Sequence, residues 1–153
     1  CAISTDVISG FCTENEEDHQ DTLKLMDYVQ YDHSYMFNYS VRPNTPAAKF
    51  RDDVPNLIKK RRLSEIIKKQ TKHSLIRNKQ KINKSYEVLI EGYSKKSSKE
   101  FYGRTEQNTV VVFPKKDHKI GDLVMVKILE CTSATLKGES IWVKYSKLRL
   151  DLE

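Results

Sequence analysis

The sequence lacks long apolar runs and is poor in cysteine, and both absences restrict its class. No stretch approaches the roughly 20 apolar residues that a membrane-spanning helix needs, and the first residues lack the basic region of a secretory signal. The three cysteines, Cys1, Cys12 and Cys131, are odd in number and widely spaced, so they form neither a disulfide framework nor a CxxC metal knuckle. We therefore expect a soluble cytoplasmic protein without a membrane partner.

Charge is divided unevenly between the two halves of the chain. Residues 1–56 hold 4 Lys+Arg against 10 Asp+Glu, which gives −6, whereas residues 57–153 hold 23 against 11, which gives +12. Two halves of opposite sign indicate two modules with different partners, and a strongly basic module is typical of a polyanion binder. An ordinary solvated basic surface is the alternative, because many basic domains bind no nucleic acid.

The acidic half has the pattern of a βαβ unit. Ala2–Gly10 mixes β-branched residues and ends in glycine, as a buried strand does before a loop. Thr13 and Glu16 have the spacing of a capping box, and apolar residues then recur at helical intervals, which predicts a helix over Glu16–Val29. Ser34–Tyr39 has the aromatic content of a second strand, so we expect two parallel strands.

A second helix is predicted from Asp52 or Asp53, as N-cap, to about Arg77, with Pro55 in its first turn. On a helical wheel the residues divide between two faces. Leu63, Ile66, Ile67 and Gln70 fall on one face, and Arg61, Arg62, Lys68, Lys69 and Lys72 fall opposite. We interpret this as a packed stripe with a solvated charged back; direct contact of the basic face with RNA is the alternative.

The basic half has the pattern of a small β-barrel. Five short β-rich runs separated by turn residues are typical of a closed, OB-like barrel of five antiparallel strands. The runs are Tyr86–Tyr93, Glu100–Thr105, Thr109–Phe113, Leu123–Cys131 and Thr135–Trp142. The polar stretch Lys79–Lys84 is the expected linker. The predicted fold class is α+β, with domains at residues 1–82 and 83–149 and a tail, 150–153, interpreted as a cloning remnant.

Several short segments of the sequence resemble known protein families. VLIEGYSKKS, GRTEQNTVVVF and IGDLVMVKI resemble the TRAM domain, a small RNA-binding barrel. STDVISGFCTENEED, YMFNYSVRPNTPAA and KKRRLSEI are similar to the last strands of the radical-SAM (β/α) barrel in tRNA methylthiotransferases. The resemblance implies the C-terminal piece of such an enzyme: the end of a radical-SAM barrel, consisting of the βαβ unit and a long basic helix, followed by a TRAM domain.

The resemblance also implies cofactors that this chain cannot hold by itself. Intact family members use SAM and two [4Fe–4S] clusters, and the catalytic cluster is bound by a CxxxCxxC loop that is absent from this sequence. We therefore expect no catalytic residue, no metal ligand and no bound cofactor in this chain, which alone is predicted inactive.

The resemblance also implies that this chain keeps part of the barrel wall that faces SAM in the intact enzymes. The implied residues are Gly10, Glu14, Arg42 and Thr45, for each of which a structural role in the barrel rim is the alternative. Cys12 replaces the family's usual proline and Asn44 replaces its glycine, although asparagine tolerates a left-handed turn.

Basic and aromatic residues interleave in the second module, as they do where proteins bind single-stranded RNA. Lysines neutralise phosphates, arginine offers a planar fork, and exposed rings stack unpaired bases. The candidate RNA-binding residues are Tyr93, Lys95, Lys96, Tyr102, Arg104, Lys115 and Lys116. For the two tyrosines the alternative is a place in the barrel core, and for Phe113 the core is the favoured interpretation. Asn108 is expected to hold a tight turn, and idle solvated charge is the alternative for Lys115 and Lys116.

Three functions are compatible with these observations. The resemblance favours the tRNA-binding part of a methylthiotransferase that modifies isopentenyladenosine beside the anticodon, as a monomer bound to the anticodon stem-loop. A free-standing, non-enzymatic RNA-binding module is the second. The predicted βαβ unit argues against it, because a barrel that binds RNA by itself does not need a half sheet with an open edge. The third is a relative acting on threonylcarbamoyladenosine in tRNA or on a ribosomal protein. The basic module favours RNA over a protein substrate.

Overall fold

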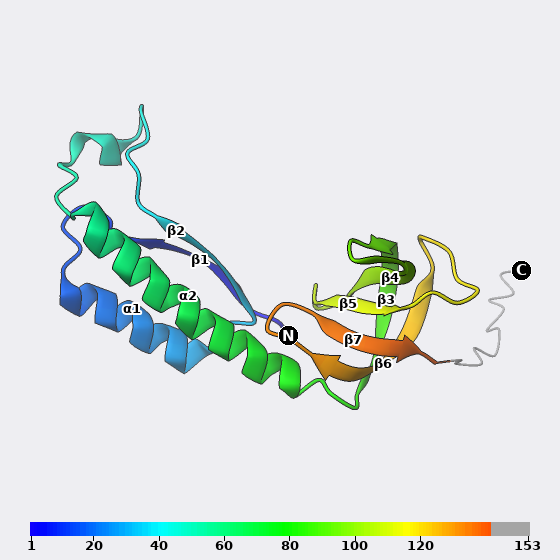
Figure 1. Cartoon of the computed structure of the whole chain (residues 1–153). Coiled ribbons are helices and arrows are strands. Elements are labelled where there is room, and N and C mark those ends of the chain that lie inside the picture. Colours follow the sequence, from blue (N-terminus) through cyan, green and yellow to red (C-terminus); the bar gives the residue numbers. More distant parts are fainter. Residues whose placement is uncertain (142–153) are drawn as a thin grey trace, which may run out of the picture. The chain divides into compact units, whose positions relative to one another are not determined.

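The computed structural model describes residues 1–141, and the chain divides into two compact units between Arg77 and Asn78 (Figure 1). The first unit is mixed α and β and the second is a small β-barrel, so the α+β class is confirmed. The unit boundary falls slightly before the one expected after residue 82. Residues 142–149 of the expected second domain, including Trp142, and the expected tail 150–153 lie outside the described residues.

The first unit is built on a parallel βαβ arrangement. Its elements are β1 (Ser4–Ser9), α1 (Glu16–Val29), β2 (His33–Asn38), the 3-10 turn η1 (Pro46–Lys49) and α2 (Asn56–Lys79). β1 and β2 pair in parallel from Ser4↔His33 to Ser9↔Asn38, which confirms the predicted unit. One sheet face buries Ser9 and Ser34, whereas Ile8, Tyr35 and Phe37 are exposed on the other.

The helix α1 has the predicted bounds but a different cap. Asn15 is extended and its side chain accepts hydrogen bonds from the Glu17 and Asp18 amides, while the Asp18 carboxylate accepts one from the Asn15 amide. The capping box is therefore Asn15 with Asp18, and the prediction of Thr13 with Glu16 is wrong. Thr13 has φ 70°, a left-handed conformation in the turn before the helix.

The helix α2 starts later than predicted because both expected caps are occupied elsewhere. Asp52 pairs with Lys59 Nζ at 2.5 Å, and Asp53 accepts a hydrogen bond from the Thr13 amide at 2.8 Å. The helix therefore begins at Asn56, directly after Pro55.

The packed face of α2 is mostly polar, so the predicted division of its two faces is wrong in part. Ile66 and Gln70 are buried as expected, but Ile67 is 43% exposed and Arg62, expected on the solvated back, is 4% exposed. Gln70 donates to the Tyr31 carbonyl and accepts from the Ser34 hydroxyl. Such a face packs only because hydrogen-bond partners from α1 and the sheet satisfy its polar groups.

The second unit is a closed five-stranded barrel. Its strands are β3 (Ser85–Ser94), β4 (Ser97–Thr105), β5 (Val110–Pro114), β6 (Leu123–Cys131) and β7 (Leu136–Ser140). They close in the order β3-β4-β5-β7-β6. The fully antiparallel prediction is wrong at one seam, where β5 and β7 pair in parallel through Val111↔Leu136 and Val112↔Lys137. The core is Val88, Ile90, Phe101, Val111, Phe113, Val124, Val126, Ile128 and Leu136.

The stretch expected to be a linker belongs to folded structure. Lys79 is the last residue of α2. Lys81 is buried and donates from Nζ to Thr109 Oγ1 at 2.9 Å, and the Asn83 amide donates to the Ile128 carbonyl at 2.9 Å. Polar composition alone predicted a linker, whereas these residues close one end of the barrel unit.

Candidate functional site

Three aromatic rings run from the barrel core to its surface. Phe113 on β5 and Phe101 on β4 are each 1% exposed, with ring centroids 6.2 Å apart. Tyr93 on β3 stacks on Phe101 at 5.3 Å with an interplanar angle of 24°, yet remains 48% exposed. Phe113 is therefore core, as favoured from the sequence, and Tyr93 is a surface ring held in place by the core beneath it.

One lysine contacts this ring, and three more lie in the adjoining turn and strand. Lys115 Nζ lies 4.9 Å from the Tyr93 ring centroid and 3.4 Å from its hydroxyl. The Lys115 amide donates to the Lys99 carbonyl at 2.8 Å, which places these two residues together at the end of the β4–β5 ladder. Lys95 and Lys96 form the exposed turn that follows β3. Within residues 1–141 none of these four lysines has a carboxylate partner, so their charge is open to an anion. We call Tyr93, Lys95, Lys96, Lys99 and Lys115 the Tyr93 cluster.

Lys99 belongs to this cluster although the sequence reading did not select it. The pairing of its backbone with Lys115 brings it there, and its place in the run KKSSKE was the signal available. Lys116 was selected, but its Nζ donates to the Ser140 carbonyl at 3.1 Å, which ties part of its hydrogen-bonding capacity to the barrel.

Arg104 and Tyr102 have other surroundings. Arg104 Nε lies 3.3 Å from Glu91 Oε2 and its Nη1 donates to Asn108 Oδ1 at 2.9 Å. Asn108 has φ 58°, which confirms its predicted role in a tight turn. Arg104 sits at the opposite end of β4 from the Lys95–Lys96 turn, so the two are not brought together. Tyr102 is half-buried and its ring lies against Gly92.

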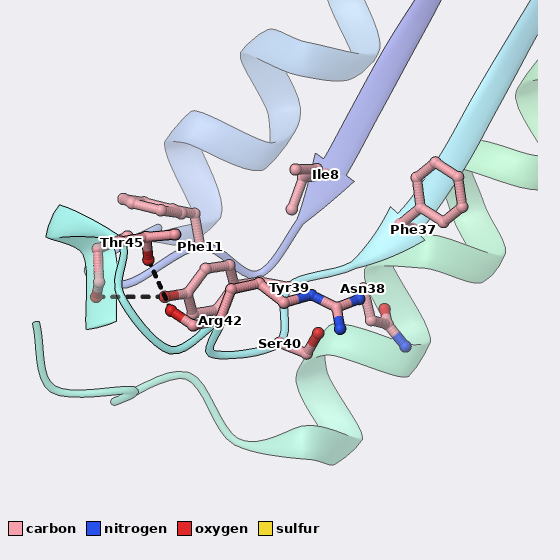
Figure 2. Close-up of a pocket in the computed structure, with 9 residues that line it drawn as sticks. Ile8, Phe11, Phe37, Asn38, Tyr39, Ser40, Arg42 and Thr45 are labelled. Carbon is pink, nitrogen blue, oxygen red and sulfur yellow. Dashed lines mark hydrogen bonds between the residues drawn. The ribbon is translucent and has the colours of Figure 1, made fainter.

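A cavity lies where β1 and β2 end in the first unit. It measures about 530 Å³ and contains both Arg42 and Thr45 from the predicted SAM wall (Figure 2). Its lining is Ile8, Phe11, Phe37, Asn38, Tyr39, Ser40, Arg42, Thr45 and Ala47. Thr45 Oγ1 donates to the Arg42 carbonyl at 2.8 Å and Asn44 has φ 65°, so the RPNTP turn is kept with asparagine in the left-handed position. A pocket of rings beside an arginine suits a planar ligand with an anionic group.

Gly10 and Glu14, the other two predicted wall residues, do not line this cavity. The Gly10 amide donates to Glu14 Oε2 at 2.8 Å, and Glu14 Oε1 accepts from Arg62 Nη1 at 2.7 Å. Gly10 has φ 77°, and a Cβ there would lie 2.4 Å from Lys59 Cγ. The close approach that requires glycine is therefore to Lys59, and the two Glu14 oxygens are occupied by protein donors.

Ion pairs between the two helices lower several carboxyl pKa values. A hydrogen bond from Arg61 lowers the pKa of Glu16 from 4.5 to about 2. A hydrogen bond from His19 lowers the pKa of Glu65, and one from Lys69 lowers the pKa of Asp27. Glu16 and Asp27 of α1 thus balance basic residues of α2 inside the unit.

The cysteines do not form a cluster-binding set. Cys1 is exposed, Cys12 is buried in the first unit and Cys131 is half-buried on β6. No group of three His, Cys, Asp or Glu side chains suited to a metal ion occurs within residues 1–141. The three cysteines therefore do not fit an iron–sulfur cluster. The same residues include no helix that is long and apolar enough to cross a membrane.

Comparison with known proteins finds two kinds of similarity. Residues 79–141 match the family model described as "TRAM domain". The tRNA-2-methylthio-N(6)-dimethylallyladenosine synthase of Amoebophilus asiaticus is 59% identical over 140 residues, which cover 91% of this chain and 29% of that protein. The protein of the same name from Christiangramia forsetii is 58% identical over 142 residues, covering 92% and 30%. This chain thus spans about 30% of the length of these relatives, and the resemblances of its sequence to the TRAM domain and to tRNA methylthiotransferases are confirmed.

A likeness to one solved structure is weaker. The solution structure of a conserved protein from Methanococcus maripaludis covers 40% of this chain and 80% of its own length, at 24% identity and a TM-score of 0.33.

Proposed function

We propose that this chain, whose residues 79–141 are a TRAM domain, binds unpaired RNA bases and their phosphates through the Tyr93 cluster. The observation that carries the proposal is the half-exposed Tyr93 ring, stacked on the buried ring of Phe101. A ring that is already fixed loses little conformational freedom when a base stacks on it, so the free energy of stacking is retained.

The lysines of the cluster supply the remaining attraction. Lys95, Lys96, Lys99 and Lys115 are exposed cations beside the ring, and a nucleotide that stacks on Tyr93 brings its phosphates within their reach. Mobile ammonium groups neutralise phosphates without reading sequence, while the ring accepts any base. The cluster therefore holds RNA and leaves the choice of nucleoside to another part of the protein.

We also propose that the chain acts as the C-terminal, RNA-holding part of a tRNA methylthiotransferase. The names of its relatives support a dimethylallyladenosine substrate in tRNA, and we expect the anticodon stem-loop as ligand, a monomer and a cytoplasmic enzyme. In the intact protein, SAM and two [4Fe–4S] clusters would supply the radical and sulfur chemistry. The parallel β1–α1–β2 unit with α2 supports an origin as the end of a radical-SAM barrel.

The strand-end cavity supports a role for Arg42 and Thr45 next to SAM or the substrate. They lie at the carboxyl ends of parallel strands, where α/β proteins place their sites. Gly10 and Glu14 support such a site indirectly in this proposal. Their mutual hydrogen bond, together with Arg62, fixes the loop after β1.

The proposal is tested by RNA binding to the full chain. We expect fluorescence anisotropy to show binding to a tRNA anticodon stem-loop that weakens as salt rises. Tyr93→Ala should weaken binding by about 5- to 150-fold, corresponding to roughly 1–3 kcal/mol for one lost stacking contact. Tyr93→Phe should keep most of the affinity because stacking needs the ring and not the hydroxyl.

Tyr28→Ala is the matched control, since Tyr28 on α1 is 89% exposed and lies outside the barrel. Equal affinities for Tyr93→Ala, Tyr28→Ala and the unchanged chain would exclude the ring as a stacking platform. Absence of any binding at low salt would overturn the RNA-binding proposal as a whole.

A further inference from the structure

The basic residues of α2 fall into two groups with different surroundings. Five of them are held by carboxylates or carbonyls of their own unit. These are Lys59, Arg61, Arg62, Lys69 and Arg77. Apart from Lys79, the last residue of the helix, the others are Lys60, Lys68 and Lys72; within residues 1–141 these three have no such partner, and all three are exposed. The one acid of α2, Glu65, is already bound by His19 and Arg61.

The unpaired lysines share one ridge of the helix. Lys60, Ser64, Lys68 and Lys72 follow one another at intervals of four residues, which is the spacing of a continuous row along a helix surface. At about 1.5 Å per residue the row extends for roughly 18 Å along the axis. The buried residues Arg62, Ile66 and Gln70 are on the other side of α2, so the row faces away from the packed interior.

We propose that this lysine row is a second RNA-binding surface, which contacts phosphates of the RNA that the barrel holds. The proposal rests on the function proposed above, because it takes the same RNA as the ligand. Charge complementarity is the argument: carboxylates and carbonyls of the first unit already hold the five basic residues named above, whereas this row is left uncompensated. A linear array of point charges without aromatic side chains suits a phosphodiester backbone, for which stacking is not needed.

The salt dependence of binding measures the contact directly. In the full chain, Lys68→Gln and Lys72→Gln should each reduce the slope of log K against log salt for the anticodon stem-loop by about one. The affinity at 0.1 M salt should fall by about five- to eightfold for each lysine, since each phosphate contact scales as salt to the power of about −0.7 to −0.9. In the double variant the slope should fall by about two, and the two losses of affinity should multiply.

Lys24→Gln is the matched control. It removes the same charge from an exposed lysine of α1 that pairs only with Asp21, so it reports any general effect of lower net charge. Thermal melting of each variant shows whether folding is intact, which we expect because these side chains are exposed.

The outcomes separate this inference from the function on which it rests. If Lys95→Gln with Lys96→Gln weakens binding while Lys68→Gln with Lys72→Gln behaves like Lys24→Gln, the barrel binds RNA and the row does not. An unchanged RNA slope together with capture of an acidic protein by the row would identify a different ligand and overturn the inference. Loss of slope in both double variants, with additive effects, supports two surfaces on one RNA.

Discussion

Replacing Arg62 should destabilise the first unit far more than replacing its neighbour Arg61. Both arginines pair with Glu16, but the Arg62 side chain is 5% exposed and that of Arg61 is 42% exposed. Arg62→Ala leaves the Glu14 carboxylate, itself only 14% exposed, without its cation. Breaking a buried pair in this way costs roughly 3–5 kcal/mol. We expect about 3 kcal/mol, the lower end of that range, because Arg62 Nε already lacks a partner in the buried state.

The Arg61→Ala control should cost less than about 1 kcal/mol, as exposed ion pairs do. Both substitutions place alanine in the same helix, so intrinsic helix propensity affects them alike. Urea unfolding is the suitable assay because a charged denaturant would screen the ion pairs. Hydrogen exchange of the α1 amides assigns the loss to the first unit. Equal losses in the two variants, or less than about 1 kcal/mol for Arg62→Ala, would refute the reasoning.

Two further predictions concern pH and the barrel. Because the folded pKa of Glu16 is about 2 against an ordinary 4.5, its stabilisation is complete above about pH 4.5 and is lost as pH falls toward 2; the lowered pKa values of Asp27 and Glu65 act in the same direction. Urea midpoints of the unchanged chain and Glu16→Gln should therefore differ at pH 7 and converge near pH 2, and a constant difference would contradict this. Gly103→Ala should destabilise the barrel by more than about 3 kcal/mol, because its Cβ would lie 2.1 Å from the Leu89 carbonyl oxygen on the paired strand. Gly121 has φ 95° but no atom within 4 Å of an added Cβ, so Gly121→Ala should lower the stability measured by thermal melting by only about 1 kcal/mol. Equal losses in Gly103→Ala and Gly121→Ala would show that the contact with the Leu89 carbonyl oxygen does not determine the cost.

Local patterns in the sequence were sufficient for most of the elements. The bounds of α1 and β6 match the prediction because apolar periodicity and turn residues mark them clearly. The closed barrel followed from five short strands with no helix to cover a sheet. The parallel β5–β7 seam could not be predicted, since it depends on which strands meet at closure and not on the pattern of either strand.

Long-range polar contacts account for what the sequence could not reveal. A helical wheel treats Arg62 as a solvated residue, yet Glu14 from far along the chain supplies the charge that lets it be buried. The same is true of Gly10, whose requirement for glycine comes from the stem of Lys59. Neither neighbour is visible in a local window.

The candidate site was predictable in part. Basic and aromatic interleaving identified Tyr93, Lys95 and Lys115; the structure places Lys115 against the Tyr93 ring and Lys95 in the exposed turn that follows it. It also selected Arg104, which lies at the other end of β4 and is engaged by Glu91 and Asn108. Residue type and spacing identify candidates for RNA contact, whereas only the register of the strands decides which of them share a surface.

Closure of the barrel determines how this module can evolve. In the part of the chain that the structure describes, each barrel strand is paired on both sides, so no strand offers a free edge along its whole length onto which a ligand could add as a further strand. Recognition therefore depends on outward-pointing side chains alone. Exchanging those side chains can retune affinity or ligand preference while the ladder and the nine-residue interior stay the same, which makes such a module easy to transfer between proteins.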